Sequence, residues 1–99
     1  MAKFQAIVLN EEDTVATAIE DLAAGGCVRV ILPDGGFMTF TVGHSIPFGH
    51  KFAIRPVSQG EPAIKYGERI GLMNASVQIG EHVHVQNLES ERGRGDLQR

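Results

Sequence analysis

The chain has 99 residues, enough for one domain with a modest core but few for an enzyme that builds a complete cleft of its own. Hydrophobic residues make up 42% and charged residues 21% of the chain, which indicates a globular protein and argues against disorder. The formal net charge of -3 and the lack of a dense Lys/Arg cluster before the last few residues argue against nucleic-acid binding. No apolar run approaches the roughly 20 residues of a membrane-spanning helix, so no membrane role is expected.

The cysteine content and the N-terminus indicate a reducing compartment. Cys27 is the single cysteine, so the chain cannot form an internal disulfide. The first ten residues, MAKFQAIVLN, lack the long apolar segment and the small-residue cleavage site of a secretory signal. We therefore expect a cytoplasmic protein, with Cys27 packed as a small apolar residue at the start of a core strand.

The N-terminal third predicts a strand followed by a helix. Residues 4–9 are rich in strand formers, and residues 10–13 combine a capping residue with acids suited to a helix N-terminus. Apolar residues then recur at positions i, i+3, i+4 and i+7, namely Val15, Ala18, Ile19 and Leu22. Because Gly25 and Gly26 supply a stop, this pattern predicts one amphipathic helix of about three turns.

The rest of the chain predicts short strands and turns. Residues 27–32 and 37–42 are strand-like and are joined by Pro33-Asp34-Gly35-Gly36, a strong turn sequence, so we expect a β-hairpin. Residues 43–51 form a Gly/Pro loop, after which residues 52–55 resume an extended pattern. Beyond Pro56 the glycines are spaced too closely for helices. The expected fold class is mainly β with one short helix.

Three segments share an apolar residue, a glycine three positions later and an alternating strand start. They are Leu22-x-x-Gly25-x-x-Val28-x-Val30, Val57-x-x-Gly60-x-x-Ala63-x-Lys65 and Val77-x-x-Gly80-x-x-Val83-x-Val85. Each copy predicts a turn that leads into a strand. The copies are too short for a solenoid, and any β protein can repeat such turns, so the motif only places strands.

Two histidines in the last third are candidate ligands. Alternation over residues 80–88 predicts a strand with Val83 and Val85 on the core face and with His82 and His84 on the other face. By strand rise the two imidazoles would lie about 7 Å apart, from which both can reach a shared metal or an anionic substrate. Because two ligands rarely suffice for a tight metal site, an ordinary solvated strand face is the competing interpretation.

Further polar candidates lie upstream. His44 and His50 fall in the Gly/Pro loop, a common place for binding residues, although a loop histidine can simply bond a backbone carbonyl. Lys51 follows, and its stem can equally well cover an apolar neighbour. Lys65 and Tyr66 offer an ammonium and a phenol to a carboxylate or hydroxyl, with an ordinary amphipathic strand end as the alternative.

Several standard enzyme signatures are missing from the sequence. It contains no G-x-S-x-G, P-loop, G-x-G-x-x-G or C-x-x-C motif. The last nine residues lose the apolar pattern and carry three arginines, which favours a mobile tail. We expect one domain over residues 1–90 and a flexible tail over residues 91–99.

Three co-linear blocks resemble a known family. They are Ile46-Pro47-Phe48-Gly49-His50-Lys51-Phe52-Ala53, then Ile64-Lys65-Tyr66-Gly67-Glu68-x-Ile70-Gly71, then Gly80-Glu81-His82-Val83-His84-Val85-Gln86-Asn87-Leu88-Glu89-Ser90. In this order the blocks resemble the small SAF-type domain of the altronate and galactarate dehydratase family, and residues 10–30 fit the usual opening of that family with lower specificity. The resemblance covers most of the chain.

This resemblance implies a β-clip fold and a role in lyases that remove water from sugar acids. A related sulfolactate sulfo-lyase pairs a similar small subunit with a large one to eliminate sulfite. By the same resemblance the partner is a large dehydratase subunit carrying a divalent metal, iron or manganese, and most of the chemistry. We expect this chain to be inactive alone and to bind no cofactor tightly by itself.

The expected site follows from the chemistry of dehydration. Loss of water from a 2,3-dihydroxy acid needs a base beside the carboxylate, a cation for the enediolate and an acid for the leaving hydroxide. The candidate catalytic residues are His50 and His84. The candidate substrate-binding residues are Lys51, Lys65, Tyr66, Asn87 and His44. The candidate metal ligands are His82 and His84.

One departure from the family pattern leaves other roles open. Gln86 stands where the family usually has histidine before asparagine, and glutamine is neither an acid–base group nor a good metal ligand. This favours a non-catalytic sugar-acid-binding module as the first alternative. A second alternative is a docking element that binds a large subunit or forms a homo-oligomer through an apolar strand face.

Overall fold

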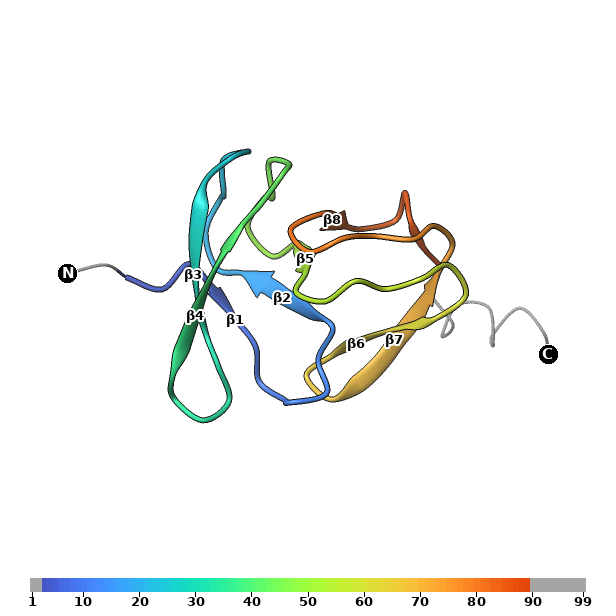
Figure 1. Cartoon of the computed structure of the whole chain (residues 1–99), viewed down its shortest axis with the longest axis horizontal. Helices are drawn as coiled ribbons and strands as arrows, with labels where there is room; N and C mark the ends of the chain where they lie inside the picture. The colour runs from blue at the N-terminus through green and yellow to red at the C-terminus, as the bar shows by residue number, and fades with distance from the viewer. Residues whose placement is uncertain (1–2, 90–99) are drawn as a thin grey trace.

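The computed structural model describes residues 3–89, which form strands and turns without a helix. The strands are β1 (Ala6–Ile7), β2 (Val15–Ala18), β3 (Cys27–Ile31), β4 (Phe37–Thr41), β5 (Lys51–Ala53), β6 (Pro62–Lys65), β7 (Glu68–Met73), β8 (His82–Val83) and β9 (Leu88–Glu89). They form a six-stranded sheet in the order β4-β3-β1-β2-β5-β8 and a three-stranded sheet in the order β6-β7-β9. The β3–β4 hairpin lies at one end of the molecule and the β6–β7 hairpin toward the other (Figure 1).

Mainly β is therefore confirmed, but the helix expected from Val15 to Leu22 is wrong. The segment Val15–Ala18 is strand β2, which pairs antiparallel with both β1 and β5. All four of its residues are buried, whereas Ile19 is largely exposed. A central strand covered on both faces has no polar side to produce alternation, so its apolar residues matched a helical spacing by coincidence. Since no helix occurs in residues 3–89, this range holds no candidate helical membrane span.

The acids before β2 hold a turn rather than cap a helix. The Asp13 carboxylate is buried and accepts hydrogen bonds from the backbone N–H groups of Leu9, Asn10 and Gly67, at 3.2, 3.3 and 2.8 Å. The side chain of Asn10 accepts from the N–H of Glu12 at 2.8 Å. Because Gly67 lies in the turn between β6 and β7, Asp13 fastens that hairpin to the β1–β2 connection.

The hairpin expected from residues 27 to 42 is confirmed. Strands β3 and β4 pair antiparallel, from Cys27 opposite Thr41 to Ile31 opposite Phe37. The expectation that Cys27 is buried is wrong, because its side chain is exposed. Along β3 burial alternates, with Val28 and Val30 in the core, and Cys27 therefore falls on the opposite face.

The motif used to place strands marks a turn that recurs four times in the structure. The glycines at its centre, Gly25, Gly49, Gly60 and Gly80, have φ between +83° and +91°, where a side chain is strained. The sequence motif had identified the turns at Gly25, Gly60 and Gly80 but not the one at Gly49. The apolar residues that open the turns pair as bridges, Leu22 with Ile46 and Val57 with Val77. The four turns therefore come as two antiparallel pairs.

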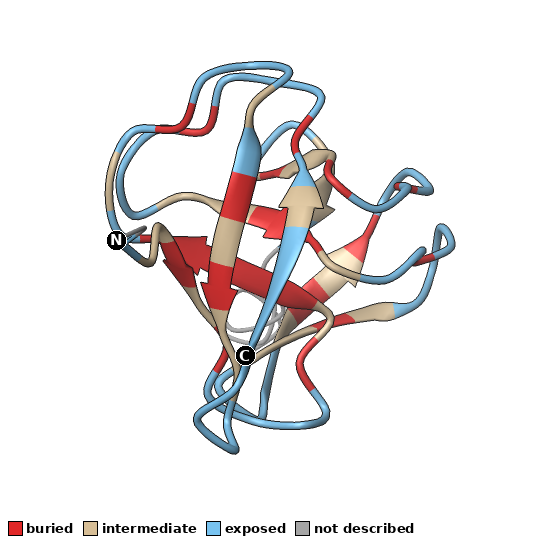
Figure 2. Cartoon of the chain, turned by 60° about the vertical axis from the view of Figure 1, so that its left-hand side comes forward, coloured by how far each residue is buried: buried red, intermediate tan, exposed pale blue. Residues whose placement is uncertain are grey.

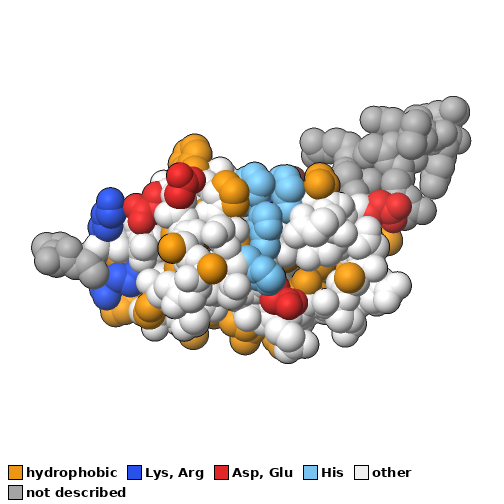
Figure 3. All heavy atoms as spheres, turned by 90° about the horizontal axis from the view of Figure 1, so that it is seen from above, with side chains coloured by type: hydrophobic (Ala, Val, Ile, Leu, Met, Phe, Trp, Pro, Cys, Tyr) orange, Lys and Arg blue, Asp and Glu red, His pale blue; other side chains and the backbone are white. Residues whose placement is uncertain are grey.

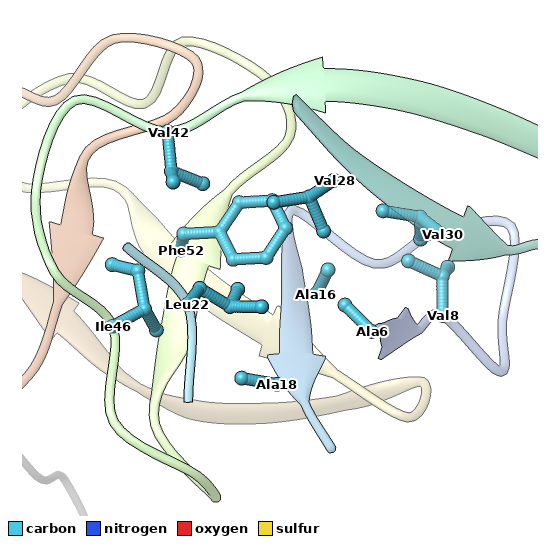
Figure 4. Packing of buried hydrophobic residues seen from close by; sticks show 10 residues of the cluster. All are labelled: Ala6, Val8, Ala16, Ala18, Leu22, Val28, Val30, Val42, Ile46 and Phe52. Atoms are coloured by element: carbon cyan, nitrogen blue, oxygen red, sulfur yellow. The ribbon is translucent and has the colours of Figure 1, made fainter. Parts of the chain in front are cut away.

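The core has two clusters that share strands β2 and β5. The ring of Phe52 lies at the centre of the first cluster (Figure 4), which comprises Ala6, Val8, Ala16, Ala18, Leu22, Val28, Val30, Val42, Ile46 and Phe52. The second cluster comprises Val15, Ala53, Val57, Ala63, Met73, Val77 and Val83. Buried residues concentrate in β1, β2, β3 and β5 of the large sheet, while its edge strand β4 and most of the turns are exposed (Figure 2). Strand β5, which begins at Lys51, is thus anchored on both faces.

Candidate functional site

Two equivalent turns bring histidines from distant parts of the chain together. The turn at Gly49 leads through His50 into β5, and the turn at Gly80 leads into β8. Strands β5 and β8 pair antiparallel, with Lys51 opposite Val83 and Phe52 opposite His82. The histidine side chains consequently form a continuous patch on one face of the molecule (Figure 3). We call His50, Lys51, His82 and His84 the His–Lys surface.

The three imidazoles of this surface are in direct contact. His50 Nδ1 and His82 Nε2 lie 2.9 Å apart, a hydrogen bond in which one nitrogen donates and the other accepts. The ring centroids of His50 and His84 are 3.9 Å apart with the rings nearly parallel, and those of His82 and His84 are 5.5 Å apart. One nitrogen from each ring falls within 4.8 Å of the other two. The cluster can share a proton or hold a cation.

Burial and neighbouring charges both disfavour protonation of His82 and His84. Partial burial lowers the pKa of His82 below its ordinary value, and the charges of His50 and His84 lower it further. Burial likewise lowers the pKa of His84, followed by the charges of His50 and Lys51. At neutral pH the rings of His82 and His84 are therefore neutral, with lone pairs able to accept a proton or bind a metal.

Lys51 is a half-buried cation close enough for its charge to act on the rings of His82 and His84. Burial lowers the pKa of its ammonium, and the charge of Lys65 lowers it further. No carboxylate of residues 3–89 forms an ion pair with Lys51. The hydroxyl of Thr17, which lies opposite Lys51 across the β2–β5 ladder, is also buried without a hydrogen-bond partner in the described part of the chain. An anionic group from outside the chain could accept hydrogen bonds from both the Lys51 ammonium and the Thr17 hydroxyl.

The strand expected over residues 80–88 ends early, after Val83. Val83 is fully buried as expected, but Val85 is 78% exposed instead of facing the core. Asn87 causes the break, since its amide accepts from the N–H of His84 at 3.0 Å and donates to the carbonyl of His82 at 2.9 Å. Asn87 thus positions the backbone that carries both histidines, and its amide is engaged with the protein itself.

His44 and Gln86 lie beside the cluster rather than in it. A shallow pocket of about 280 Å³ is lined by His44, Ser76, Val77, Glu81, His82, Gln86 and Asn87. His44 itself is exposed and is close enough to His82 to lower the pKa of that ring. The amide of Gln86 makes only a long, 3.4 Å hydrogen bond to the carbonyl of His82. Because His82 lines this pocket as well, the pocket adjoins the His–Lys surface.

Lys65 and Tyr66 lie apart, at the turn of the β6–β7 hairpin. Tyr66 has a φ of +54°, and its ring centroid lies 5.0 Å from Lys65 Nζ. Within the described residues the Tyr66 ring contacts none of the histidine rings. Lys65 is linked to the site only through its charge, which acts on Lys51. The arginines of residues 91–99 lie outside the described residues.

A second, apolar pocket lies elsewhere on the molecule. It has a volume of about 370 Å³, and Val8, Leu32, Met38 and Phe40 form much of its wall. Its charged residues, among them Glu11, Asp34 and Arg55, do not belong to the His–Lys surface. None of the residues that line this pocket belongs to the His–Lys surface, so the two are separate features of the molecule.

Sequence reasoning found the histidines but missed how they meet. It placed His82 and His84 on one strand face and treated His50 as a separate loop residue. The signal that could have joined them is the fourth copy of the turn motif, Ile46-x-x-Gly49-x-x-Phe52. Aligning Gly49 with Gly80 matches His50 with Glu81 and Lys51 with His82. This alignment predicts that strands begin at Lys51 and at His82, as they do in the structure.

The chain is similar to known proteins over most of its length. Residues 4–91 match the model of the altronate/galactarate dehydratase SAF domain. The chain is 35% identical over 88 residues to the (2R)-sulfolactate sulfo-lyase subunit alpha of Chromohalobacter salexigens, covering 87% of this chain and 94% of that protein. It is 39% identical over 86 residues to the altronate dehydratase of Escherichia coli, covering 87% of this chain but 16% of that protein.

A further relative repeats the first pattern. The (2R)-sulfolactate sulfo-lyase subunit alpha of Paracoccus pantotrophus is 36% identical over 63 residues, covering 64% of this chain and 94% of that protein. The family thus occurs both as a small subunit and as a minor part of a much longer chain. With a family model spanning nearly all of the described residues, the chain belongs to the altronate/galactarate dehydratase SAF-domain family.

Proposed function

We propose that this chain is the small subunit of a lyase acting on a hydroxy acid, and that its His–Lys surface forms one wall of an active site completed by a large subunit. Two relatives that align over 94% of their own length are named as subunits, which supports a partner chain. In the altronate dehydratase of Escherichia coli the matching region is 16% of one chain, so there the rest of the protein supplies the remainder. Whether the domain is a separate subunit or part of a longer chain, it is accompanied by a larger protein portion.

The observation that carries the proposal is the half-buried ammonium of Lys51, which has no ion-pair partner among residues 3–89 and whose charge acts on His82 and His84. A carboxylate or sulfonate placed there would gain a charge-assisted hydrogen bond in a partly desolvated position. The ammonium of Lys65 adds a second positive charge, which acts on Lys51 and would also attract an anion. The surface therefore fits the acid group of the substrate, which sugar acids and sulfonated hydroxy acids share.

The histidines suit the proton transfers of an elimination. His84 has a ring that is neutral at neutral pH, and His50 shares a hydrogen bond with His82. One of these rings can accept the proton next to the substrate carboxylate, and the hydrogen-bonded pair can pass it on. Stacking of His50 on His84 brings the two candidate catalytic rings together.

A second candidate product deserves the same assay. The chain aligns with 94% of two sulfolactate sulfo-lyase alpha subunits, which favours sulfite as the leaving group. The resemblance to altronate dehydratase favours water instead. Both eliminations begin with removal of a proton from an anionic hydroxy acid, so the His–Lys surface serves either reaction.

We expect the metal of the enzyme and its cellular compartment to be those that the family resemblance implies. We place a divalent metal, iron or manganese, in the large subunit, where it would stabilise the enediolate. The exposed free thiol of Cys27 fits a reducing cytoplasm.

The test is reconstitution with the large subunit. The chain and its candidate partner are purified together, and the formation of a 2-oxo acid or of sulfite is measured with altronate, galactarate and sulfolactate. We expect activity only with both chains. Replacing His50 or His84 by alanine should lower kcat by more than about tenfold, because a proton-transfer group is lost. Lys51→Met should raise KM by at least about tenfold, because the acid group loses its partner.

The control is Lys3→Ala, which removes an exposed lysine that pairs with Glu20. Its activity should equal that of the wild type. Full activity in His50→Ala, His84→Ala and Lys51→Met would disprove the proposed wall. An unchanged kcat with raised KM in all three would instead favour a binding module.

A further inference from the structure

We propose that His50, His82 and His84 form a metal site belonging to this chain itself, which takes a borderline divalent cation such as Zn²⁺. This goes beyond the proposed function, which requires no metal on the small subunit. Sequence reasoning offered only His82 and His84, and two ligands are too few for a tight site. The structure supplies the third ligand, His50, from the residue just before β5, 32 positions upstream of His82.

The nitrogen positions are close to those a metal needs. Ligand nitrogens at about 2.1 Å from a tetrahedral cation lie roughly 3.3 Å from one another. One nitrogen of each ring already lies within 4.8 Å of the other two, and the closest pair is 2.9 Å apart. The nearest pair has to open slightly and the farther ring has to approach by about 1–2 Å, which side-chain rotation can supply. No movement of the strands is needed.

The chemistry of the ligands selects the class of cation. Three imidazoles offer borderline nitrogen donors, the ligand type that suits Zn²⁺ and similar cations. The set contains no carboxylate among the described residues, which disfavours Ca²⁺ and Mg²⁺. Three histidines around Zn²⁺ leave one coordination position open for water or an anion.

The backbone holds the three ligands in fixed relation. The β5–β8 register, with Lys51 opposite Val83 and Phe52 opposite His82, continues to place His50 opposite His84, and the His50 ring also reaches His82. Asn87 fixes the short turn that carries His84. A site whose ligands are already placed loses less entropy on binding than three unrelated surface histidines would.

A bound metal would change what the histidines can do. Coordination occupies the nitrogen lone pairs, so the His50–His82 hydrogen bond and proton transfer through it are lost while metal is present. Lys51 remains beside the cation, and the two charges together favour an anion. The metal-bound and metal-free forms are therefore functionally distinct.

The test uses the full chain without a partner or substrate. Zn²⁺ is titrated into the chain by calorimetry, and Co²⁺ is followed by its visible absorption. We expect one Zn²⁺ per chain with a Kd at or below about 10 µM. His50→Ala, His82→Ala and His84→Ala should each weaken binding at least about tenfold. The matched control, His44→Ala, removes a histidine from the same face and should stay within about twofold of wild type.

A second measurement does not depend on variants. Imidazole nitrogen resonances of the wild-type chain should move on adding Zn²⁺ for the three ligands and stay in place for His44. The proposal is overturned if the chain binds no Zn²⁺, if His44→Ala weakens binding as much as the others, or if any of the three substitutions leaves the affinity unchanged. Because no lyase activity is measured, failure here leaves the proposed function standing, and failure of the reconstituted lyase leaves this site standing.

Discussion

Asp13 is a single buried carboxylate on which three backbone groups depend. Its two oxygens accept from the N–H groups of Leu9, Asn10 and Gly67, and these belong to two separate connections. Replacing Asp13 by alanine leaves these donors without a partner in a buried place, which should cost about 2–4 kcal/mol of unfolding free energy. Urea denaturation followed by circular dichroism measures this loss.

The control for Asp13 is its neighbour Glu12. Glu12 carries the same charge but is exposed, so Glu12→Ala should change the unfolding free energy by no more than about 0.5 kcal/mol. Equal effects of the two substitutions would show that charge, rather than the buried hydrogen bonds, matters at this turn.

The sequence did not predict which side chains hold the backbone in place. It predicted Asp13 as part of a helix start and Asn87 as a substrate-binding residue, whereas both form hydrogen bonds with backbone groups whose positions the fold sets. His82 and His84 were found because alternation is a local property. Their contact with His50 was not, since a separation of 32 positions leaves no periodic signal.

The repeated glycine turn is the element that positions the site, and Gly80 is its most constrained copy. Its φ is +91°, and an added Cβ would run into the carbonyl oxygen of Thr41. Gly80→Ala should therefore lower the unfolding free energy by about 2–4 kcal/mol, through backbone strain and through displacement of β8. It should also disturb the histidine cluster, visible as altered His82 and His84 imidazole resonances.

Gly43 is the matched control for that turn. It lies close to Gly80, to whose carbonyl its N–H donates at 3.0 Å, but its φ is not positive and an added Cβ meets open space. Gly43→Ala should stay within about 0.5 kcal/mol of the wild type. If both substitutions are tolerated, the turn at Gly80 does not hold β8 in place.

At the level of elements, turns were easier to predict than the strands between them. Glycine at a fixed distance from an apolar residue marked three of the four turns, since positive φ restricts the residue type directly. Strand β2 was misread because a strand buried on both faces lacks alternation. The β3–β4 hairpin was predicted because its turn sequence and its flanking strands agree.

For the whole molecule, two exposed apolar side chains near the histidines are where the proposed large subunit is expected to bind. Phe48 is 66% and Val85 is 78% exposed, and each lies within two positions of a cluster histidine, His50 or His84. Large apolar side chains in such positions commonly mark a protein interface. A large subunit that covers them would also exclude water from the His–Lys surface.

Phe48→Ser and Val85→Ser test this docking geometry. Both side chains are exposed, so thermal stability of the isolated chain should not fall, whereas association with the large subunit should weaken at least about tenfold for each, as the loss of one buried apolar side chain predicts. Affinity is measured by titrating the small subunit against the immobilised large one. The control is Met38→Ser, which removes a 50% exposed apolar side chain from β4, at the opposite edge of the six-stranded sheet from β8, and should leave affinity unchanged. Weakening by Met38→Ser alone would instead locate the interface at the apolar pocket, leaving the histidines uncovered and the proposed shared active site without its second wall.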